Sequence, residues 1–89
     1  MTHHTLRSWP QFFQAIKAGK KTHDLRETDR DFAVGDTATL EEFNPITGTY
    51  TGDRCDVEIT YITDRDHACA FSSAVLDRRF CILSIQKTA

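Results

Sequence analysis

Cysteine is scarce in this sequence, and long runs of apolar residues are absent. The chain has three cysteines, Cys55, Cys69 and Cys81, whose odd number and wide spacing argue against a disulfide framework and against a zinc site. No apolar run approaches the roughly 20 residues that a membrane-spanning helix needs, and the N-terminus lacks the apolar core of a signal peptide. We therefore expect buried thiols, no membrane segment, no metal or other cofactor, and a cytoplasmic location.

Acidic residues are absent from the first 23 positions, although the whole chain has a formal net charge of −2. Four cations precede the first carboxylate: Arg7, Lys17, Lys20 and Lys21. Residues 36–89, in contrast, hold five basic and nine acidic side chains, a balance of −4. The first quarter of the chain is predicted to form a local positive surface, whose size suits a few phosphates rather than a long duplex.

Hydrophobic periodicity predicts a single small domain, residues 1–89, that is α+β but mainly β. A short amphipathic helix should follow Ser8, a candidate N-cap, with Pro10 in its first turn. Apolar residues spaced i, i+3, i+4 and i+7 form one helical face, which we expect to pack in the core: Trp9, Phe12, Phe13 and Ile16. Gly19 is predicted to end the helix.

The remaining chain predicts five or six short strands, a number that favours a small β-barrel over a sandwich of separate layers. Residues 44–48 predict a hairpin connection, and residues 64–77 a charged turn followed by a loop or a helical turn. The strands that we expect most clearly cover residues 4–7, 22–27, 37–43, 57–62 and 79–85.

Several strand side chains are assigned to a face by alternation. Leu25 is expected to point inward, which places Asp24 and Arg26 together on the opposite face. Phe32 and Val34 are expected to return to the core. Three residues of the long strand are expected to share one face: Val57, Ile59 and Tyr61.

Charged residues gather where the helix should end and the next strand should begin. Lys20, Lys21 and Arg26 could clasp a phosphate, the lysines as point charges and the arginine through its planar fork. The alternative is structural, with Lys20 capping the helix and Arg26 forming an internal ion pair with Asp24 or Glu42. The spacing of these residues leaves both interpretations open.

Glu42 is expected to face the core, because it alternates with Ala38 and Leu40. An unpaired carboxylate there would be costly. We therefore expect a cationic partner, for which Arg26 and Lys21 are the best candidates.

A series of short motifs runs through residues 4–62 and returns near the C-terminus. They are HTLR (4–7), WPQFF (9–13), GKKT (19–22), LR (25–26), DRDF (29–32), VGD (34–36), LEEF (40–43), YTG (50–52), YI (61–62) and CILSI (81–85). In their order and spacing the chain resembles the ASCH domains, which are relatives of the PUA fold. The resemblance is strongest to a short phage and bacterial branch of uncharacterised function.

The resemblance implies a PUA-like β-barrel with a cleft beside the first helix, and a role in binding RNA, single-stranded nucleic acid or a nucleotide. The cleft of the ASCH domains usually carries a lysine, an acidic residue and an arginine, which correspond to Lys21, Asp24 and Arg26. The acidic position is commonly glutamate, so Asp24 is one methylene shorter.

Further candidates for the ligand surface lie outside this set. Arg7 belongs to the positive first quarter of the chain. Arg30 could project onto a nucleic-acid backbone, although the turn at Asp29–Asp31 is equally explained by side-chain to backbone hydrogen bonds. Tyr50, at a hairpin tip, is a candidate for stacking on a base, whereas Trp9 fits the apolar helical face too well to be expected on the surface.

Two other function classes are open. A small hydrolase acting on RNA or a modified nucleoside could use Lys21, Asp24 and Glu42 as acid and base groups. Some ASCH proteins cleave an acetyl amide with a threonine nucleophile, but Asp24 stands at that position, and a carboxylate cannot serve as that hydroxyl. A protein-interaction factor of the phage type would make contact through residues 64–79.

Overall fold

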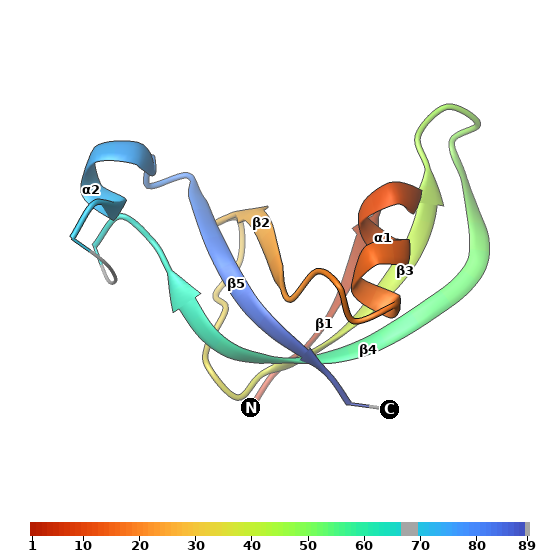
Figure 1. The fold of residues 1–89 in the computed structure, drawn as a ribbon, viewed down its shortest axis with the longest axis horizontal. Coiled ribbons are helices and arrows are strands. Elements are labelled where there is room, and N and C mark those ends of the chain that lie inside the picture. Colours follow the sequence, from red (N-terminus) through yellow and green to blue (C-terminus); the bar gives the residue numbers. More distant parts are fainter. Residues whose placement is uncertain (67–69, 89) are drawn as a thin grey trace.

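The computed structural model describes residues 1–66 and 70–88. This part of the chain forms one curled, five-stranded sheet and two short helices, a half-barrel that is mainly β (Figure 1). The elements are β1 (His3–Ser8), α1 (Pro10–Lys17), β2 (His23–Glu27), β3 (Thr37–Asn44), β4 (Thr49–Thr63), α2 (Ser72–Val75) and β5 (Phe80–Lys87). The predicted fold class, mainly β with one amphipathic helix near the N-terminus, is confirmed.

The strand order in the sheet is β1-β3-β4-β5-β2, so β1 and β2 are its two edges. β1 runs parallel to β3, and every other neighbouring pair is antiparallel. The sheet curls far enough for an edge-to-edge contact: the Arg26 guanidinium on β2 donates a hydrogen bond to the Arg7 carbonyl oxygen on β1 at 2.8 Å. A side chain, rather than a backbone ladder, therefore bridges the open side of the half-barrel.

The hydrophobic core lies on the inner face of the sheet, where α1 covers it. α1 contributes Phe13 and Ile16, which are almost completely buried. Burial of one such side chain stabilises the fold by roughly 1.5–3 kcal/mol. The strands contribute Leu6, Ala38, Leu40, Cys55, Val57, Ile59, Cys81, Leu83 and Ile85. The inward face predicted for Ala38, Leu40 and Glu42 is confirmed.

Cys55 and Cys81 are buried thiols within the described residues, as expected, and Cys69 lies outside those residues. Burial disfavours a thiolate and raises the pKa of both thiols. Their small apolar side chains therefore serve packing.

The predicted end of α1 is confirmed in detail. Gly19 has a φ of 77°, which an L-residue with a side chain rarely adopts. The Gly19 N–H donates to the Ile16 carbonyl at 3.0 Å, and the Lys20 N–H donates to the Ala15 carbonyl at 2.9 Å. This pair of bonds is a Schellman motif, so the backbone of Lys20 helps to cap the helix.

The predicted start of α1 is wrong in one respect. Ser8 is buried at the end of β1, and the N-cap is Trp9, which makes no side-chain capping bond. Trp9 therefore precedes the helix and is not part of its buried face. Trp9 and Phe12 are 49% and 45% exposed, so the expectation that both pack in the core is wrong.

The predicted orientation of β2 is also wrong. Leu25 is exposed and Asp24 is buried, because Asp24 pairs with Leu83 on β5 and residues directly opposite each other share a face. Asp24 and Arg26 do share one face, but it is the inner one, and Arg26 is partly buried there.

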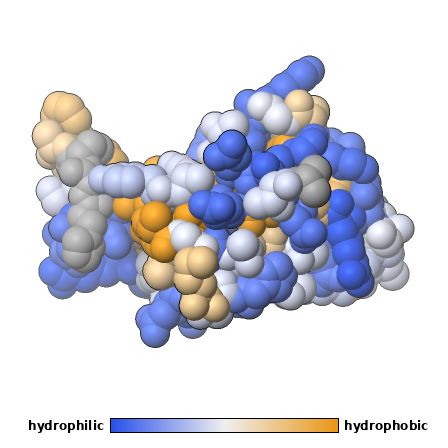
Figure 2. Space-filling view, turned by 90° about the horizontal axis from the view of Figure 1, so that it is seen from below, coloured by the Kyte–Doolittle hydropathy of each residue, from blue (hydrophilic) through white to orange (hydrophobic). Residues whose placement is uncertain are grey.

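Two other apolar residues are more exposed than expected. A register shift between Ile59 and Tyr61 reverses the alternation of β4, so Tyr61 is exposed while Ile62 packs against the core. Phe32 also packs against the core, but Val34 is exposed. On the face shown in Figure 2, hydrophobic residues are visible left of the middle and in smaller groups toward the upper edge, among hydrophilic residues.

A buried polar pair fixes the start of the chain. His4 Nε2 lies 2.9 Å from Asp36 Oδ2, and the backbone N–H groups of Thr2 and Ala33 each donate to the same carboxylate at 3.0 Å. The hydrogen bond from His4, with those from the backbone, lowers the pKa of Asp36 to about 2. Asp36 thus joins β1 to the loop that precedes β3.

The segment predicted as a loop or helical turn contains α2, and residues 67–69 lie outside the described part of the chain. Phe71 and Val75, beside and on α2, are largely exposed. A protein contact through residues 64–79 stays a prediction.

None of the helices formed by the described residues is both long enough and apolar enough to cross a membrane.

Candidate functional site

The gap between the edge strands β1 and β2, which we call the seam, is an open groove beside α1. It contains two pockets on either side of Arg26. The helix-side pocket, of about 210 Å³, is lined by Arg7, Ser8, Trp9, Phe12, Asp24, Leu25 and Arg26. The loop-side pocket, of about 290 Å³, is lined by Leu6, Leu25, Arg26, Glu27, Asp29, Arg30 and Phe32.

Arg26 is held in place at the centre of the seam. Its Nε donates to Asp24 Oδ2 at 2.7 Å, and its Nη2 donates to the Arg7 carbonyl at 2.8 Å. These two acceptors occupy two of the five N–H groups of the guanidinium. The side chain of Arg26 keeps 21% of its area exposed, and that of Asp24 12%. Arg26 is therefore oriented by the protein while remaining accessible to an anion.

The ion pair of Arg26 with Asp24 was one of the two structural alternatives for these charges. The short Asp24 side chain reaches Arg26 because both residues lie on β2 and point to the same face. In the comparison with ASCH domains, Asp24 and Arg26 correspond to residues of the ligand cleft. The two interpretations are compatible, because the pair that orders the seam also faces its pockets.

An aromatic wall forms the other side of the helix-side pocket. The rings of Trp9 and Phe12 are stacked, with centroids 6.3 Å apart and an angle of 20° between their planes. The Lys21 ammonium lies 5.9 Å from the centroid of the Phe12 ring, within the range of a cation–π contact. Lys20, in contrast, is exposed. Asp24 and Arg26 therefore line this pocket together with the two aromatic residues, and Lys21 lies beside the ring of Phe12.

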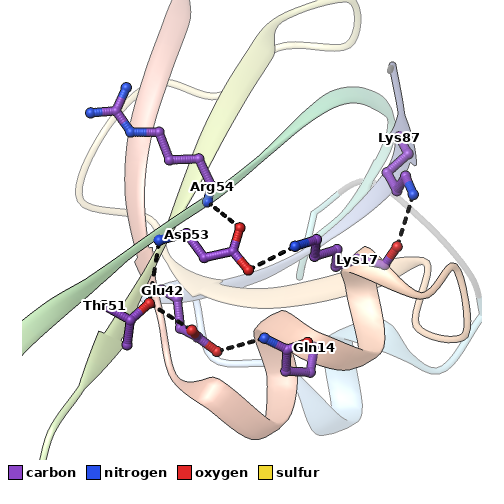
Figure 3. Close-up of polar contacts among 7 residues, drawn as sticks. All are labelled: Gln14, Lys17, Glu42, Thr51, Asp53, Arg54 and Lys87. Carbon is purple, nitrogen blue, oxygen red and sulfur yellow. Dashed lines mark hydrogen bonds and ion pairs between the residues drawn. The ribbon is translucent and has the colours of Figure 1, made fainter.

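Glu42 does not join this group, and the prediction of a cationic partner for it is wrong. Its carboxylate accepts hydrogen bonds from Gln14 Nε2 at 2.9 Å and from the Thr51 hydroxyl at 2.6 Å (Figure 3). Two neutral donors thus satisfy the buried carboxylate in place of Arg26 or Lys21.

The contacts drawn in Figure 3 also hold α1 against the sheet. Lys17 Nζ lies 2.7 Å from Asp53 Oδ2 on β4, and Lys87 Nζ donates to the Lys17 carbonyl at 2.8 Å. The ion pair raises the pKa of Lys17 and lowers that of Asp53. Because α1 carries Phe12, these contacts fix one wall of the seam.

The residues of the candidate catalytic set, Lys21, Asp24 and Glu42, each make a different contact. Lys21 lies by the Phe12 ring, Asp24 accepts from Arg26, and Glu42 is bound by Gln14 and Thr51. These contacts link none of the three residues to another, and joint acid–base work by them stays a prediction.

The other candidate residues lie around the seam or next to it. Arg30 lines the loop-side pocket and is 3.6 Å from the Asp29 carboxylate. Arg7 lines the helix-side pocket, and its guanidinium carbon lies 4.9 Å from the centroid of the Phe43 ring. Phe43 in turn contacts the predicted stacking residue Tyr50, which is 54% exposed.

Sequence reasoning missed Phe43 and Thr51, and the predicted hairpin could have found both. Counting pairs outward from the 44–48 connection places Phe43 opposite Tyr50, as observed. The next pair then sets Thr51 opposite Glu42, where a hydroxyl can satisfy the carboxylate. The exposed stack of Trp9 on Phe12 had no comparable signal.

Comparison with known proteins supports the resemblance to uncharacterised phage proteins, whereas membership of the ASCH domains stays a prediction. A relative in Escherichia phage P2, "Uncharacterized 12.9 kDa protein in GpA 3'region", is 33% identical over 61 residues. The alignment covers 68% of this chain and 54% of the phage protein, so the chain spans about half the length of that relative. Residues 3–85 match the family described as "Domain of unknown function (DUF3850)". Because that match runs from the start of β1 into β5 and so covers nearly the whole chain, the chain belongs to the DUF3850 family.

Proposed function

We propose that the protein binds RNA or a nucleotide in the seam between β1 and β2, in the manner expected of an ASCH-type, PUA-like cleft. The observation that carries this proposal is the position of Arg26. Its guanidinium is oriented by Asp24 and by the Arg7 carbonyl, lies between two open pockets, and faces the stacked pair of Trp9 and Phe12 across one of them.

This combination suits the two parts of a nucleotide. A guanidinium binds phosphate through charge-assisted hydrogen bonds in a planar fork. An exposed aromatic ring stacks on a nucleobase of any sequence, which contributes about 1–3 kcal/mol per base. Lys21 beside Phe12 adds a second cation near the same ring. The ligand that fits is therefore one with both a base and a phosphate, bound with little sequence preference.

The distribution of charge supports the same choice. The chain is acidic overall, yet Arg7 and Arg26 both line the helix-side pocket, and Lys21 lies beside the Phe12 ring in the wall of that pocket. Attraction of an anion is thus local to the seam, and binding should weaken as salt is added.

Titration of the protein with uridine monophosphate and with short oligouridylates tests the proposal. Trp9 is the only tryptophan of the chain and forms part of the pocket wall, so its fluorescence should change on binding. The double variant Asp24→Asn, Arg26→Gln removes the guanidinium without leaving a buried carboxylate unpaired. We expect it to bind at least about tenfold more weakly, because hydrogen bonds to charged groups contribute roughly 1.5–3 kcal/mol.

Arg78→Gln is the matched control, because Arg78 is 75% exposed and pairs with Asp66 outside both pockets of the seam. Equal affinities of the wild type and the double variant would contradict the proposed site. Breakdown of the oligonucleotide by the wild-type protein would instead favour the hydrolase alternative.

A further inference from the structure

A second aromatic surface lies on the outer face of the β3–β4 hairpin. Phe43 and Tyr50 are directly opposite each other in the ladder, and their rings meet edge to face with centroids 5.0 Å apart. The core residues of β3 lie on the other face of the sheet, so this pair is not part of the core. We call Phe43 and Tyr50 the hairpin pair.

Arg7 connects the hairpin pair to the seam. Its guanidinium lies over the Phe43 ring at 4.9 Å, its carbonyl accepts the hydrogen bond from Arg26, and it lines the helix-side pocket. A pair of aromatic rings, a pair of cations and a second pair of aromatic rings therefore follow one another along one path. The path runs from Trp9 and Phe12, past Arg26 and Arg7, to the hairpin pair.

Three acidic residues near the hairpin pair have partners of their own. Glu41 lies opposite Arg7 in the ladder and is 3.6 Å from Arg54, Glu42 is bound by Gln14 and Thr51, and Asp53 is paired with Lys17. Their charges still disfavour a phosphate close to the tyrosine. The hairpin pair is accordingly suited to the face of a base, with the adjoining phosphate nearer Arg7.

We infer that the ligand of the seam is a single strand of several nucleotides, which continues over Arg7 and stacks a further base on Tyr50. This inference rests on the proposed function and extends it from a nucleotide site to a strand-binding path. Alternating rings and cations are the pattern by which single strands are held without reading their sequence. The inference assigns Tyr50 to the strand and not to the first nucleotide.

The test compares ligands of different length on matched tyrosine variants. Tyr50→Ala should lower the affinity for an eight-residue oligouridylate about tenfold, the effect of losing one stacked base. It should leave the affinity for uridine monophosphate unchanged. Tyr50→Phe keeps the ring and should behave like the wild type with both ligands.

Tyr61→Ala is the control for loss of an exposed tyrosine, because Tyr61 lies on the same strand, is 56% exposed and is outside the path. If Tyr50→Ala left the affinity for the octanucleotide unchanged, the strand path would be wrong, while binding of the mononucleotide would still support the seam. An equal loss with both ligands would show a structural role for Tyr50 and overturn the inference. Failure of the wild type to bind either ligand, or binding of a protein partner alone, would overturn both proposals.

Discussion

The two sides of the half-barrel are held together differently, one by backbone ladders and the other by a side-chain hydrogen bond. Across β3, β4 and β5 the strands pair through backbone ladders that contain two register shifts, and the inner face is largely apolar, with residues such as Leu40, Val57 and Leu83. Where β1 and β2 meet, the ladder is missing, and the inner face carries Asp24 and Arg26. Two half-exposed aromatic residues, Trp9 and Phe12, also line this side.

The difference shows what closes a curled sheet when its edges do not pair. Unpaired edges leave backbone groups that need partners, and a guanidinium can reach across to supply one. A charge placed there stays partly solvated, so it loses less hydration free energy on folding and remains accessible to a ligand. The candidate site therefore lies at the break in the sheet, and the core lies where the sheet is continuous.

The adjacent residues Phe13 and Phe12 separate the two sides most sharply. Phe13 is completely buried, so Phe13→Ala should lower the free energy of unfolding by about 3–5 kcal/mol. Phe12 is 45% exposed, and Phe12→Ala should cost less than about 1.5 kcal/mol, since much of the ring already contacts water. Urea unfolding of both variants measures the difference, and similar losses would contradict the assignment of Phe12 to the seam.

Removal of Arg26 should have an intermediate effect on stability. Arg26→Ala leaves the Asp24 carboxylate and the Arg7 carbonyl without this donor, which should cost about 1–3 kcal/mol. The double variant Asp24→Asn, Arg26→Gln should be more stable than Arg26→Ala, because it leaves a neutral pair in place of an unpaired carboxylate. Thermal unfolding of Arg26→Ala and of the double variant tests this. A double variant as unstable as Arg26→Ala would show that the charged guanidinium itself is needed to join β1 and β2.

The pair of His4 and Asp36 lines neither pocket of the seam, and its contribution to stability should depend on pH. The folded protein lowers the pKa of Asp36 from 3.8 to about 2, so the stabilisation is fully present above pH 4 and is lost as the pH falls toward 2. Asp36→Asn should flatten the dependence of stability on pH between 4 and 2. A variant whose pH profile matches the wild type over that interval would show that Asp36 does not carry the acid sensitivity.

Sequence patterns predicted the elements that depend on neighbours in the chain. Gly19 readily adopts the left-handed backbone conformation that ends α1. The 44–48 connection forms the expected hairpin. The inner face of β3 follows simple alternation through Ala38, Leu40 and Glu42. These features are local, so no information from distant residues was needed.

Patterns failed where distant strands decide the outcome. Leu25 and Asp24 were assigned to the wrong faces because the pairing with β5, almost sixty residues further along the chain, sets the orientation of β2. Tyr61 was misassigned because a register shift against the same strand interrupts the alternation of β4. Lys21, Asp24 and Arg26 were found as a group because they are close in sequence, whereas the partners of Glu42 come from α1 and β4.

By itself, the sequence determined a small, mainly β domain with a short helix ended at Gly19, a hairpin at 44–48, and a positive first quarter. Only the tertiary structure decided that β1 and β2 stay unpaired, that Arg26 bridges them, and that Trp9 and Phe12 remain partly exposed beside it. The physical reason is that turns and helix ends are fixed by the conformational preferences of a few adjacent residues. The seam, in contrast, depends on the order and register in which all five strands pair.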